Sequence, residues 1–307
     1  MTLDWGTCDH RDLLRRHNPH LPAYCFDGAA APSTASSAGN AIDLPNLDAP
    51  IFRVLPLGRL LSSLRDQQIT LTRVRCWPDP FENWLLRGRG RMASGELVSL
   101  SNIFESYFGQ CWTLNEDSDA MWRIYSADEE GIKVRTTVRK LFAAFYDSAN
   151  PTVSVSDFVG LVRYLPQEQI ERLMTGDGIA PRLLFDNTGV MQTRVLLTKR
   201  FEFSHEAEVR LIRSLDRSHP QFANDYPPFR VDTNAVFDEL MIDPRCKPLR
   251  VREITTAIQD AGYSNAVGQS SLYNPPNWEF AIPDDSLPGP LDERVWNALT
   301  TAPRPRP

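Results

Sequence analysis

The stretch KRFEFSHEAEVRLIRSL, residues 199–215, constrains the fold most, because its side chains alternate between apolar and polar almost without a break. The apolar side chains occupy odd positions, namely Phe201, Phe203, Ala207, Val209 and Leu211. The even positions carry polar and charged side chains, including Glu206, Glu208 and Arg210. A period of two residues is typical of a β-strand with one buried face. The pattern therefore predicts a strand over 199–215 whose apolar face packs on a core.

The polar face of this predicted strand carries chemistry or simply meets water. Glu206 and Glu208 would project from it roughly 6.6 Å apart. Two carboxylates that close raise each other's affinity for protons, and Arg210 on the same face would partly offset this. Such an array can stabilise a developing cation, activate a hydroxyl group or hold a metal ion. The alternative is a solvated face with cross-strand ion pairs.

The rest of the chain predicts an α+β fold, a mixed α/β arrangement with a central mixed sheet flanked by helices. Residues 51–56 and 109–114 read as strands, and residues 57–68 as a short amphipathic helix. Near the end, a strand at 236–243, a helix at 249–263 and a strand at 265–273 fit a crossover that makes the two strands parallel.

Composition divides the chain into four parts. Residues 1–26 form a polar arm, and residues 27–50 are rich in Ala, Ser, Pro and Gly, as expected of a linker. Residues 51–283 are predicted to form a single catalytic-type α/β domain, and residues 284–307 a proline-rich tail. The arm carries Cys and His residues, but without the paired spacing of a zinc site we expect no metal there: Cys8, His10, His17, His20 and Cys25.

Charge and hydropathy limit the environments and partners we expect. The net charge is −6 and no run of like charge occurs, which disfavours a strong general nucleic-acid surface. No stretch approaches the roughly 20 apolar residues of a membrane helix. Five widely spread cysteines, an odd number, suit reduced thiols. The sequence therefore predicts a cytoplasmic protein without a membrane partner.

Two further segments combine aromatic and ionisable side chains. WPDPFENW, residues 77–84, places Asp79 and Glu82 on a proline-stiffened turn, which also fits helix capping and aromatic packing. DAMWRIYSADEEG, residues 119–131, predicts a helix on which Met121, Trp122 and Tyr125 lie at i, i+1 and i+4, a spacing that is commonly that of core residues. The sequence contains no nucleotide-binding glycine loop, no G-x-S-x-G and no H-E-x-x-H.

Three motifs in this order resemble the bacterial family known as domain of unknown function 2971. They are DPFEN, then CWTL followed by DAMWRIYSADEEGI, and then KRFEFSHEAEVRLI, which contains K-x-x-x-F-x-x-E-x-E-x-R. The resemblance covers roughly residues 51–275. It implies a common fold and no assigned activity.

A weaker resemblance is to ADP-ribosyltransferases, and it implies a split central sheet and NAD as substrate. By position, Arg53 on an early strand would hold the phosphates, and Thr113 would be the polar residue of a middle strand. Glu206 and Glu208 match the Glu-x-Glu of a late strand. Glu208 would stabilise the oxocarbenium-like cation, Glu206 would be the general base, and Arg210 would complete the catalytic group. Tyr125 or Trp122 would form an aromatic wall. The Ser-Thr-Ser of that family is absent.

Several functions remain open at this level. The resemblance implies transfer of ADP-ribose from a small nucleotide substrate to an unknown macromolecular acceptor, without a metal, and it allows a role in toxin-like or anti-phage systems. In a metal-dependent nuclease or phosphodiesterase, four carboxylates would gather Mg²⁺: Asp79, Glu82, Glu206 and Glu208. A non-catalytic module would use the same polar face to bind a ligand or partner.

Overall fold

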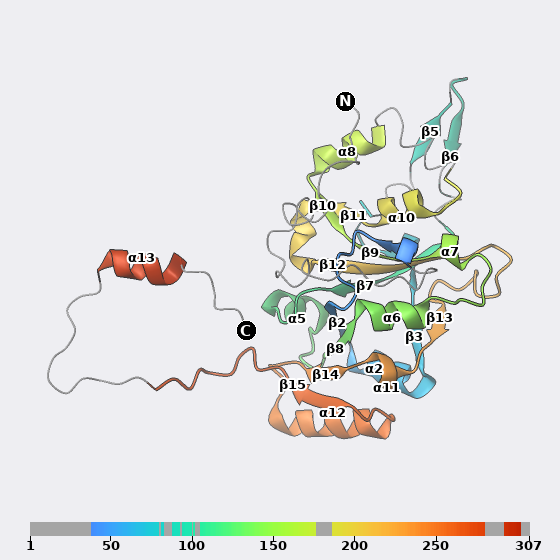
Figure 1. Ribbon diagram of the computed structural model, residues 1–307. Coiled ribbons are helices and arrows are strands. Elements are labelled where there is room, and N and C mark those ends of the chain that lie inside the picture. Colours follow the sequence, from blue (N-terminus) through green and yellow to red (C-terminus); the bar gives the residue numbers. More distant parts are fainter. Residues whose placement is uncertain are drawn as a thin grey trace. The chain divides into compact units, whose positions relative to one another are not determined.

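The main feature of the computed structural model is a nine-stranded mixed sheet, which confirms the predicted fold class (Figure 1). The structure describes residues 38–79, 81–82, 88–92, 94–99, 101, 105–175, 186–279 and 292–301. The strands of the sheet are β1 (Ala41–Ile42), β2 (Pro50–Leu55), β4 (Thr72–Arg73), β7 (Tyr107–Thr113), β8 (Ile132–Thr137), β9 (Asp157–Leu161), β12 (Glu208–Ser214), β14 (Glu239–Ile242) and β15 (Ala266–Gln269). Their order is β1-β9-β12-β7-β2-β8-β14-β15, with β4 paired to β7.

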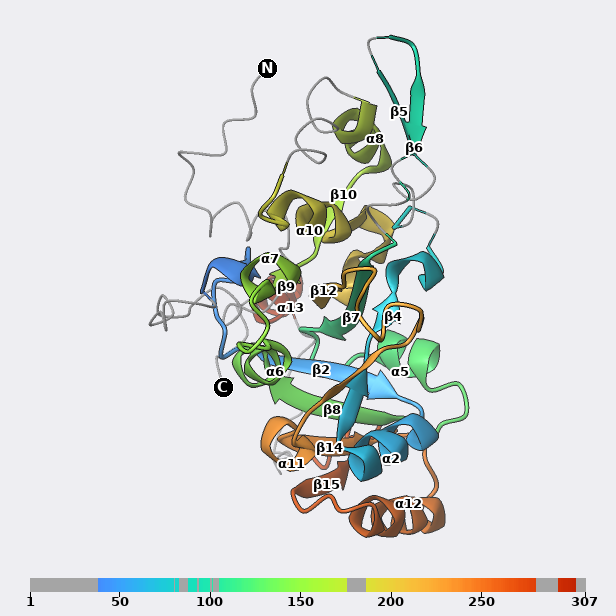
Figure 2. The same ribbon diagram turned by 90° about the vertical axis from the view of Figure 1, so that its right-hand side faces the viewer.

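The sheet is split between β2 and β7, as the resemblance to ADP-ribosyltransferases implied. These two strands share a single register pair, Phe52 with Thr113. By contrast, β7 pairs with β12 along its whole length, and β2 pairs with β8 from Pro50 to Leu55. Two half-sheets therefore diverge from one point, and β2 lies beside β8 in one of them (Figure 2).

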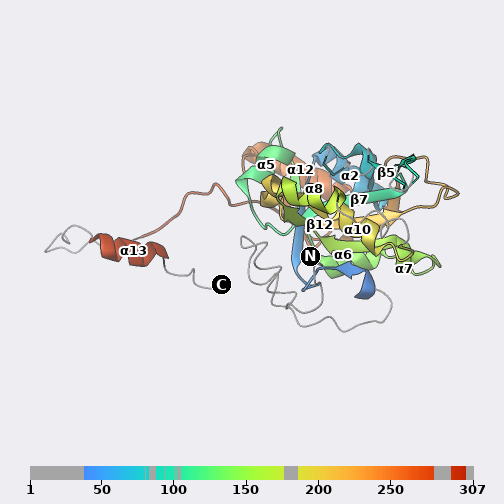
Figure 3. The same ribbon diagram turned by 90° about the horizontal axis from the view of Figure 1, so that it is seen from above.

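Helices cover both sides of the sheet. Seen from above, α2 and α12 lie on one side of β7 and β12, and α6 and α7 lie on the other (Figure 3). The helices are α2 (Leu57–Asp66), α5 (Asp119–Tyr125), α6 (Val138–Phe145), α7 (Val153–Ser156), α8 (Gln167–Thr175), α10 (Val190–Leu196), α11 (Thr233–Val236) and α12 (Pro248–Asp260). Three two-stranded sheets complete this part of the chain: β3 (Gln68–Thr70) with β13 (Pro228–Arg230), β5 (Arg89–Arg91) with β6 (Leu97–Ser99), and β10 (Arg163–Leu165) with β11 (Thr198–Arg200).

Local sequence explains several of these elements. The hydroxyl of Thr137 accepts from the backbone N–H of Lys140 and so caps the start of α6. Pro248 occupies the first turn of α12, where a missing N–H costs nothing. The parallel pairing of β14 with β15 across α12 confirms the predicted crossover.

The predicted strand over 199–215 is wrong in its first half. Strand β11 ends at Arg200, a 3-10 helix occupies Phe201–Glu206, and β12 begins at Glu208. Ala207 between them is left-handed, with φ 45°. The physical reason is tertiary: Lys199 is held in the small parallel pair with β10, so the chain must turn before it can enter the main sheet. Alternation resumes within β12, but both of its faces are buried.

The described part of the predicted linker, residues 38–50, belongs to the folded chain. Strand β1 pairs in parallel with β9. Asn40 is buried, and its Nδ2 donates to the carbonyl oxygens of Val153, Ser154 and Asp157. These contacts tie residues 38–42 into the fold, so a linker reaching residue 50 is too long. Residues 1–37, including the Cys/His arm, lie outside the described residues.

The chain divides into two compact units, residues 1–273 and 274–307. The second contains α13 (Glu293–Thr301), which lies within the predicted tail. Among the residues that the structure describes, no helix is both long and apolar enough to span a bilayer.

Candidate active site

A buried cluster of opposite charges lies where β11, the 3-10 helix and β12 meet. Lys199 on β11 places its Nζ 2.6 Å from Glu208 Oε1 and 3.3 Å from Glu82 Oε1, and it also contacts Glu206 Oε2. Arg210 places its Nε 2.6 Å from Glu208 Oε2 and also contacts Glu82. These five side chains are 0–9% exposed. The polar face of β12 is therefore not a solvated one.

The turn between Glu206 and Glu208 is fixed by hydrogen bonds to β7 and the residues after it. Thr113 Oγ1 donates to the carbonyl oxygen of Glu206 at 2.6 Å, and the N–H of Leu114 donates to that of Ala207. Asn115 Nδ2 donates to the carbonyl oxygen of His205 at 2.7 Å. The left-handed backbone of Ala207 costs about 1 kcal/mol or more, and these hydrogen bonds offset that cost. Both carboxyl groups thus reach the same pocket, although they do not share one strand.

The pocket that these carboxyl groups line has a volume of about 110 Å³ and opens at the split of the sheet. Tyr125 lines it, and its hydroxyl donates to Glu206 Oε1 at 3.3 Å. Arg53 on β2 lines it too, so residues from both half-sheets meet there. The remaining lining residues are Phe52, Val54, Cys111, Trp112, Thr113 and Met121.

Arg53 has an unsatisfied hydrogen-bond donor at this pocket. Its Nη1 atom is buried and has no hydrogen-bond partner. Burial, together with the positive charge of Arg59, lowers the pKa of Arg53 and outweighs the opposing effect of Glu208. An unpaired buried donor of this kind costs free energy unless a ligand or water supplies an acceptor.

Arg53 and Trp112 also line a second, larger cavity of about 410 Å³. This cavity lies against α2 and β3. It presents a second arginine, Arg59, together with hydroxyl and amide groups from Ser62, Ser63, Gln68, Thr70 and Gln110. The lining also contains the carboxylate of Asp66 and apolar or aromatic side chains: Leu55, Ile69, Trp112, Tyr226 and Phe237. Such a mixed lining can accept a ligand that has both a planar apolar part and an anionic part.

The two carboxyl groups differ in their electrostatic surroundings. Burial, followed by the hydrogen bond and negative charge of Glu208, raises the pKa of Glu206 to about 7. Burial also acts on Glu208, but the positive charges of Arg210 and Lys199 and its hydrogen bonds outweigh it and hold the pKa of Glu208 well below its usual value. Burial and the charge of Glu206 raise the pKa of Tyr125, so its phenol stays protonated. At neutral pH one carboxylate is fixed as an anion and the other is poised to exchange a proton.

Two of the predicted site residues are placed differently from the expectation. Trp122 is 1% exposed, its Nε1 donates to Asp117 Oδ1 at 2.7 Å, and it does not line the pocket. The indole is therefore part of the core, because its one N–H donor is satisfied by Asp117, which lies just before α5. Of the two aromatic residues, Tyr125 lines the pocket and Trp122 does not. Arg210 is fully buried, contacts Glu208, and lines neither of these two cavities. Its contacts support Glu208 and do not reach a ligand in this geometry.

Thr113 lines the pocket, but its hydroxyl is engaged by the carbonyl oxygen of Glu206. Its contact holds the turn that carries Glu206. Sequence reasoning missed Lys199 as part of the site, although it is the first residue of the K-x-x-x-F-x-x-E-x-E-x-R stretch. The motif therefore contained Lys199, but an extended strand would place a lysine far from a glutamate seven residues later. The 3-10 helix over Phe201–Glu206, which the sequence did not predict, brings the two side chains together.

The four carboxylates of the metal alternative do not form one set. Asp79 pairs with a different cation, because its Oδ1 lies 3.0 Å from Arg200 Nη2. Glu82, Glu206 and Glu208 converge, but on Lys199 and Arg210, whose fixed positive charges take the place that a divalent ion would need. In the described part of the chain, no group of three or more His, Cys, Asp or Glu side chains is arranged to hold a metal ion.

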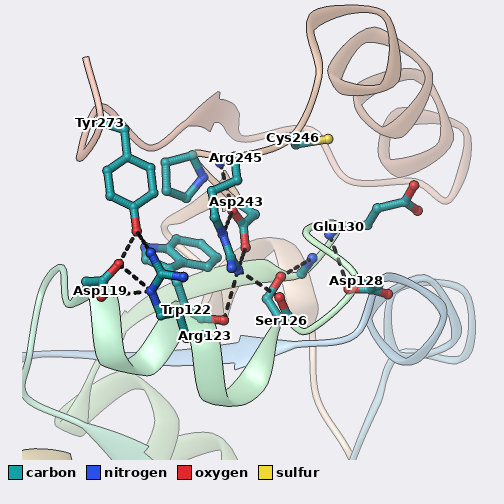
Figure 4. Close-up of polar contacts among 12 residues, drawn as sticks. Asp119, Trp122, Arg123, Ser126, Asp128, Glu130, Asp243, Arg245, Cys246 and Tyr273 are labelled. Atoms are coloured by element: carbon teal, nitrogen blue, oxygen red, sulfur yellow. Dashed lines mark hydrogen bonds and ion pairs between the residues drawn. The ribbon is translucent and has the colours of Figure 1, made fainter. Parts of the chain in front are cut away.

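Arg245 and Asp243 hold the C-terminal end of helix α5, the helix that carries Tyr125 (Figure 4). Arg245 Nη2 donates to the carbonyl oxygens of Ser126 at 2.7 Å and Trp122 at 3.2 Å, at the C-terminal end of the helix. Asp243 holds the same guanidinium at 2.7 Å. A cation at a helix C-terminus is favourable because the last carbonyl groups have no intrahelical partner. The phenol of Tyr125 is thus presented from a fixed helix.

Comparisons with known proteins give a distant structural likeness and no sequence relative. No protein-family model matches the chain, and no curated protein matches it. The resemblance to domain of unknown function 2971 therefore stays a prediction. The structure of Thermus sp. 2.9 DarT in complex with ADP-ribosylated ssDNA matches with a TM-score of 0.35 and 12% identity, over 73% of this chain and 94% of that one. DarT of the same organism in complex with NAD+ matches with a TM-score of 0.34 and 12% identity, over 73% and 96% of the two chains. A likeness this distant gives no residue of this chain a role.

Proposed function

We propose that the chain is an NAD-using ADP-ribosyltransferase, which breaks the bond between nicotinamide and ribose and transfers ADP-ribose to an acceptor. One observation carries the proposal: the Glu208 carboxylate and the unpartnered Nη1 of Arg53 line the same pocket at the split of the sheet. A fixed anion suits a reacting carbon that becomes positive, and a guanidinium with an unpartnered N–H donor suits a phosphate. NAD has both features in one molecule.

The two adjoining cavities support a dinucleotide as the ligand. The nicotinamide end would enter the pocket beside Tyr125 and Glu208, and the adenosine end would occupy the larger cavity beside α2. Arg53 lines both cavities, so it would contact the diphosphate that joins the two ends. Arg59 adds a second positive charge in the larger cavity. The aromatic ring of Tyr125 offers a flat wall to a planar base.

The chemistry assigns a separate task to each carboxyl group. The bond between the ribose C1′ and the nicotinamide nitrogen breaks, and its electron pair leaves with neutral nicotinamide. Glu208 stabilises the positive charge that develops on the ribose, because it is already ionised and fixed before the reaction. The acceptor then bonds to C1′ and gives its proton to Glu206, the general base. No metal takes part in these steps.

The proposal is tested by incubating the full chain with NAD labelled on the adenylate, while free nicotinamide is measured in parallel. Protein, RNA and single-stranded DNA serve as acceptors, and water serves when they are left out. Arg53→Met should weaken NAD binding at least about 10-fold, since a charge-assisted contact is lost. Arg135→Met is the matched control, because Arg135 is 45% exposed and pairs with Glu239 on the surface.

Two results would count against the proposal in different ways. If calorimetry shows no NAD binding and no nicotinamide appears with any acceptor, the proposal fails. If NAD binds, depends on Arg53, and is never cleaved, the chain is a non-catalytic ligand-binding module.

A further inference from the structure

Lys199 has the most central position in the charge cluster, although the proposed reaction gives it no task. Its ammonium group lies between three carboxyl groups, at 2.6 Å from Glu208 and 3.3 Å from Glu82, and in contact with Glu206. Lys199 is 7% exposed and does not line the pocket. It therefore acts on a ligand through the glutamates.

We propose that Lys199 is a positioning residue, which holds Glu206 and Glu208 side by side, while Arg210 pairs with Glu208 and so leaves Glu206 as the one that exchanges a proton. The roles of the two glutamates in catalysis rest on the proposed function, but the difference between their charge states does not. The proposal stands on an asymmetry in the contacts that each carboxyl group makes.

Glu208 receives more positive charge than Glu206. One of its oxygens faces Lys199 and the other faces Arg210, both at 2.6 Å. Its backbone N–H also donates to the hydroxyl of Tyr164, which fixes the start of β12. Glu206 shares Lys199, accepts a hydrogen bond from the neutral phenol of Tyr125 at 3.3 Å, and also faces the negative charge of Glu208. When two buried carboxyl groups compete for one negative charge, the one nearer to two cations keeps it.

The charged and titratable groups around Glu206 come from six elements. Lys199 lies on β11, Glu208 on β12, Tyr125 on α5, Tyr164 on β10, Arg53 on β2 and Cys111 on β7. Lys199 is the cation in direct contact with it. The raised pKa of Glu206 and the lowered pKa of Glu208 agree with this arrangement. Loss of the ammonium group would raise the pKa of Glu206 further, because its anion would lose the opposite charge.

The test is carbon-13 NMR of chains labelled at the glutamate carboxyl carbon, titrated across neutral pH. The wild-type chain should show one carboxyl group that titrates near pH 7, and Glu206→Gln should remove that signal. Lys199→Met should move the midpoint upward by about 1–3 pH units, as loss of a close opposite charge does. Lys199→Arg should keep it near the wild-type value. Lys140→Met is the matched control, because Lys140 is 48% exposed and pairs with Asp238 on the surface.

An unchanged midpoint in Lys199→Met, or a signal near pH 7 that persists in Glu206→Gln, would overturn the proposal. If Lys199→Met does not fold, the double variant Lys199→Met/Glu208→Gln removes one fixed charge of each sign and should recover a cooperative thermal transition. A double variant no more stable than the single one would also overturn it. These measurements need no turnover, so they separate a failure of this proposal from a failure of the proposed function.

Where nicotinamide release is active, its pH profile gives a second test. In Lys199→Met the acid side of the profile should move to higher pH together with the NMR midpoint. A lower rate with an unmoved profile would show that Lys199 is structural alone.

Discussion

Arg210→Met should destabilise the fold by about 3–5 kcal/mol, because it breaks a buried ion pair and leaves the partners behind. Arg210 is fully buried, and its guanidinium contacts Glu208, Glu82 and the carbonyl oxygen of Leu196. Methionine keeps much of the volume and can still pack on Trp77, whose ring lies 4.6 Å from the guanidinium carbon. The loss is therefore mainly electrostatic.

The assay for Arg210→Met is urea unfolding at neutral pH, followed by tryptophan fluorescence and far-ultraviolet circular dichroism. Adding Glu208→Gln to Arg210→Met should recover part of the lost stability, because it removes the uncompensated charge. Arg139→Met is the control and should cost far less, since Arg139 is 40% exposed and solvent screens its pair with Asp48. A loss below about 1 kcal/mol in Arg210→Met would refute the view that this guanidinium holds the cluster together.

Four further outcomes are expected. Trp122→Ala should lower the free energy of unfolding by about 3–5 kcal/mol in urea, as a large aromatic truncation in a core does; an unchanged value would show that the indole is not core. Asn40→Ala should cost about 1–3 kcal/mol in the same assay, because the carbonyl groups of Val153 and Asp157, which are buried, and of Ser154, which is partly buried, lose a donor; an unchanged free energy of unfolding would show that these contacts do not anchor residues 38–42. Nicotinamide release should rise as pH passes about 7, where Glu206 loses its proton and can act as a base. The protonation of Glu206 contributes stability that is complete below its unfolded pKa of 4.5 and lost as pH rises through about 7, so Glu206→Gln should flatten the thermal stability over that range.

The sequence predicted those features of the fold that depend on local periodicity. The alternation in residues 208–214 marked a strand, and the apolar spacing in 249–263 marked the helix that connects two parallel strands. The early strand with Arg53 and the middle strand with Thr113 were also found where expected. The split of the sheet came from the resemblance, since no local pattern states how two strands diverge.

The remaining features depend on contacts between distant segments. The alternation from Phe201 to Glu206 looked like a strand, but the pairing of Lys199 with β10 forces a turn there. Whether Trp122 faced a pocket or the core could not be read from helical spacing, because it depends on Asp117 and Lys133 behind it. The burial of Arg210 is set by the elements that cover β12, which the strand's own sequence does not describe.

The central claim is that Glu208 stabilises the cation formed when NAD is cleaved, and Glu208→Gln tests it most directly. Glutamine keeps the shape of the side chain and removes its charge, so NAD should still bind. Release of nicotinamide should fall by a factor on the order of 100 or more. Glu253→Gln, at a glutamate that is 53% exposed, should leave the rate unchanged. A folded Glu208→Gln chain that binds NAD and releases nicotinamide within a few-fold of the wild-type rate would contradict the account.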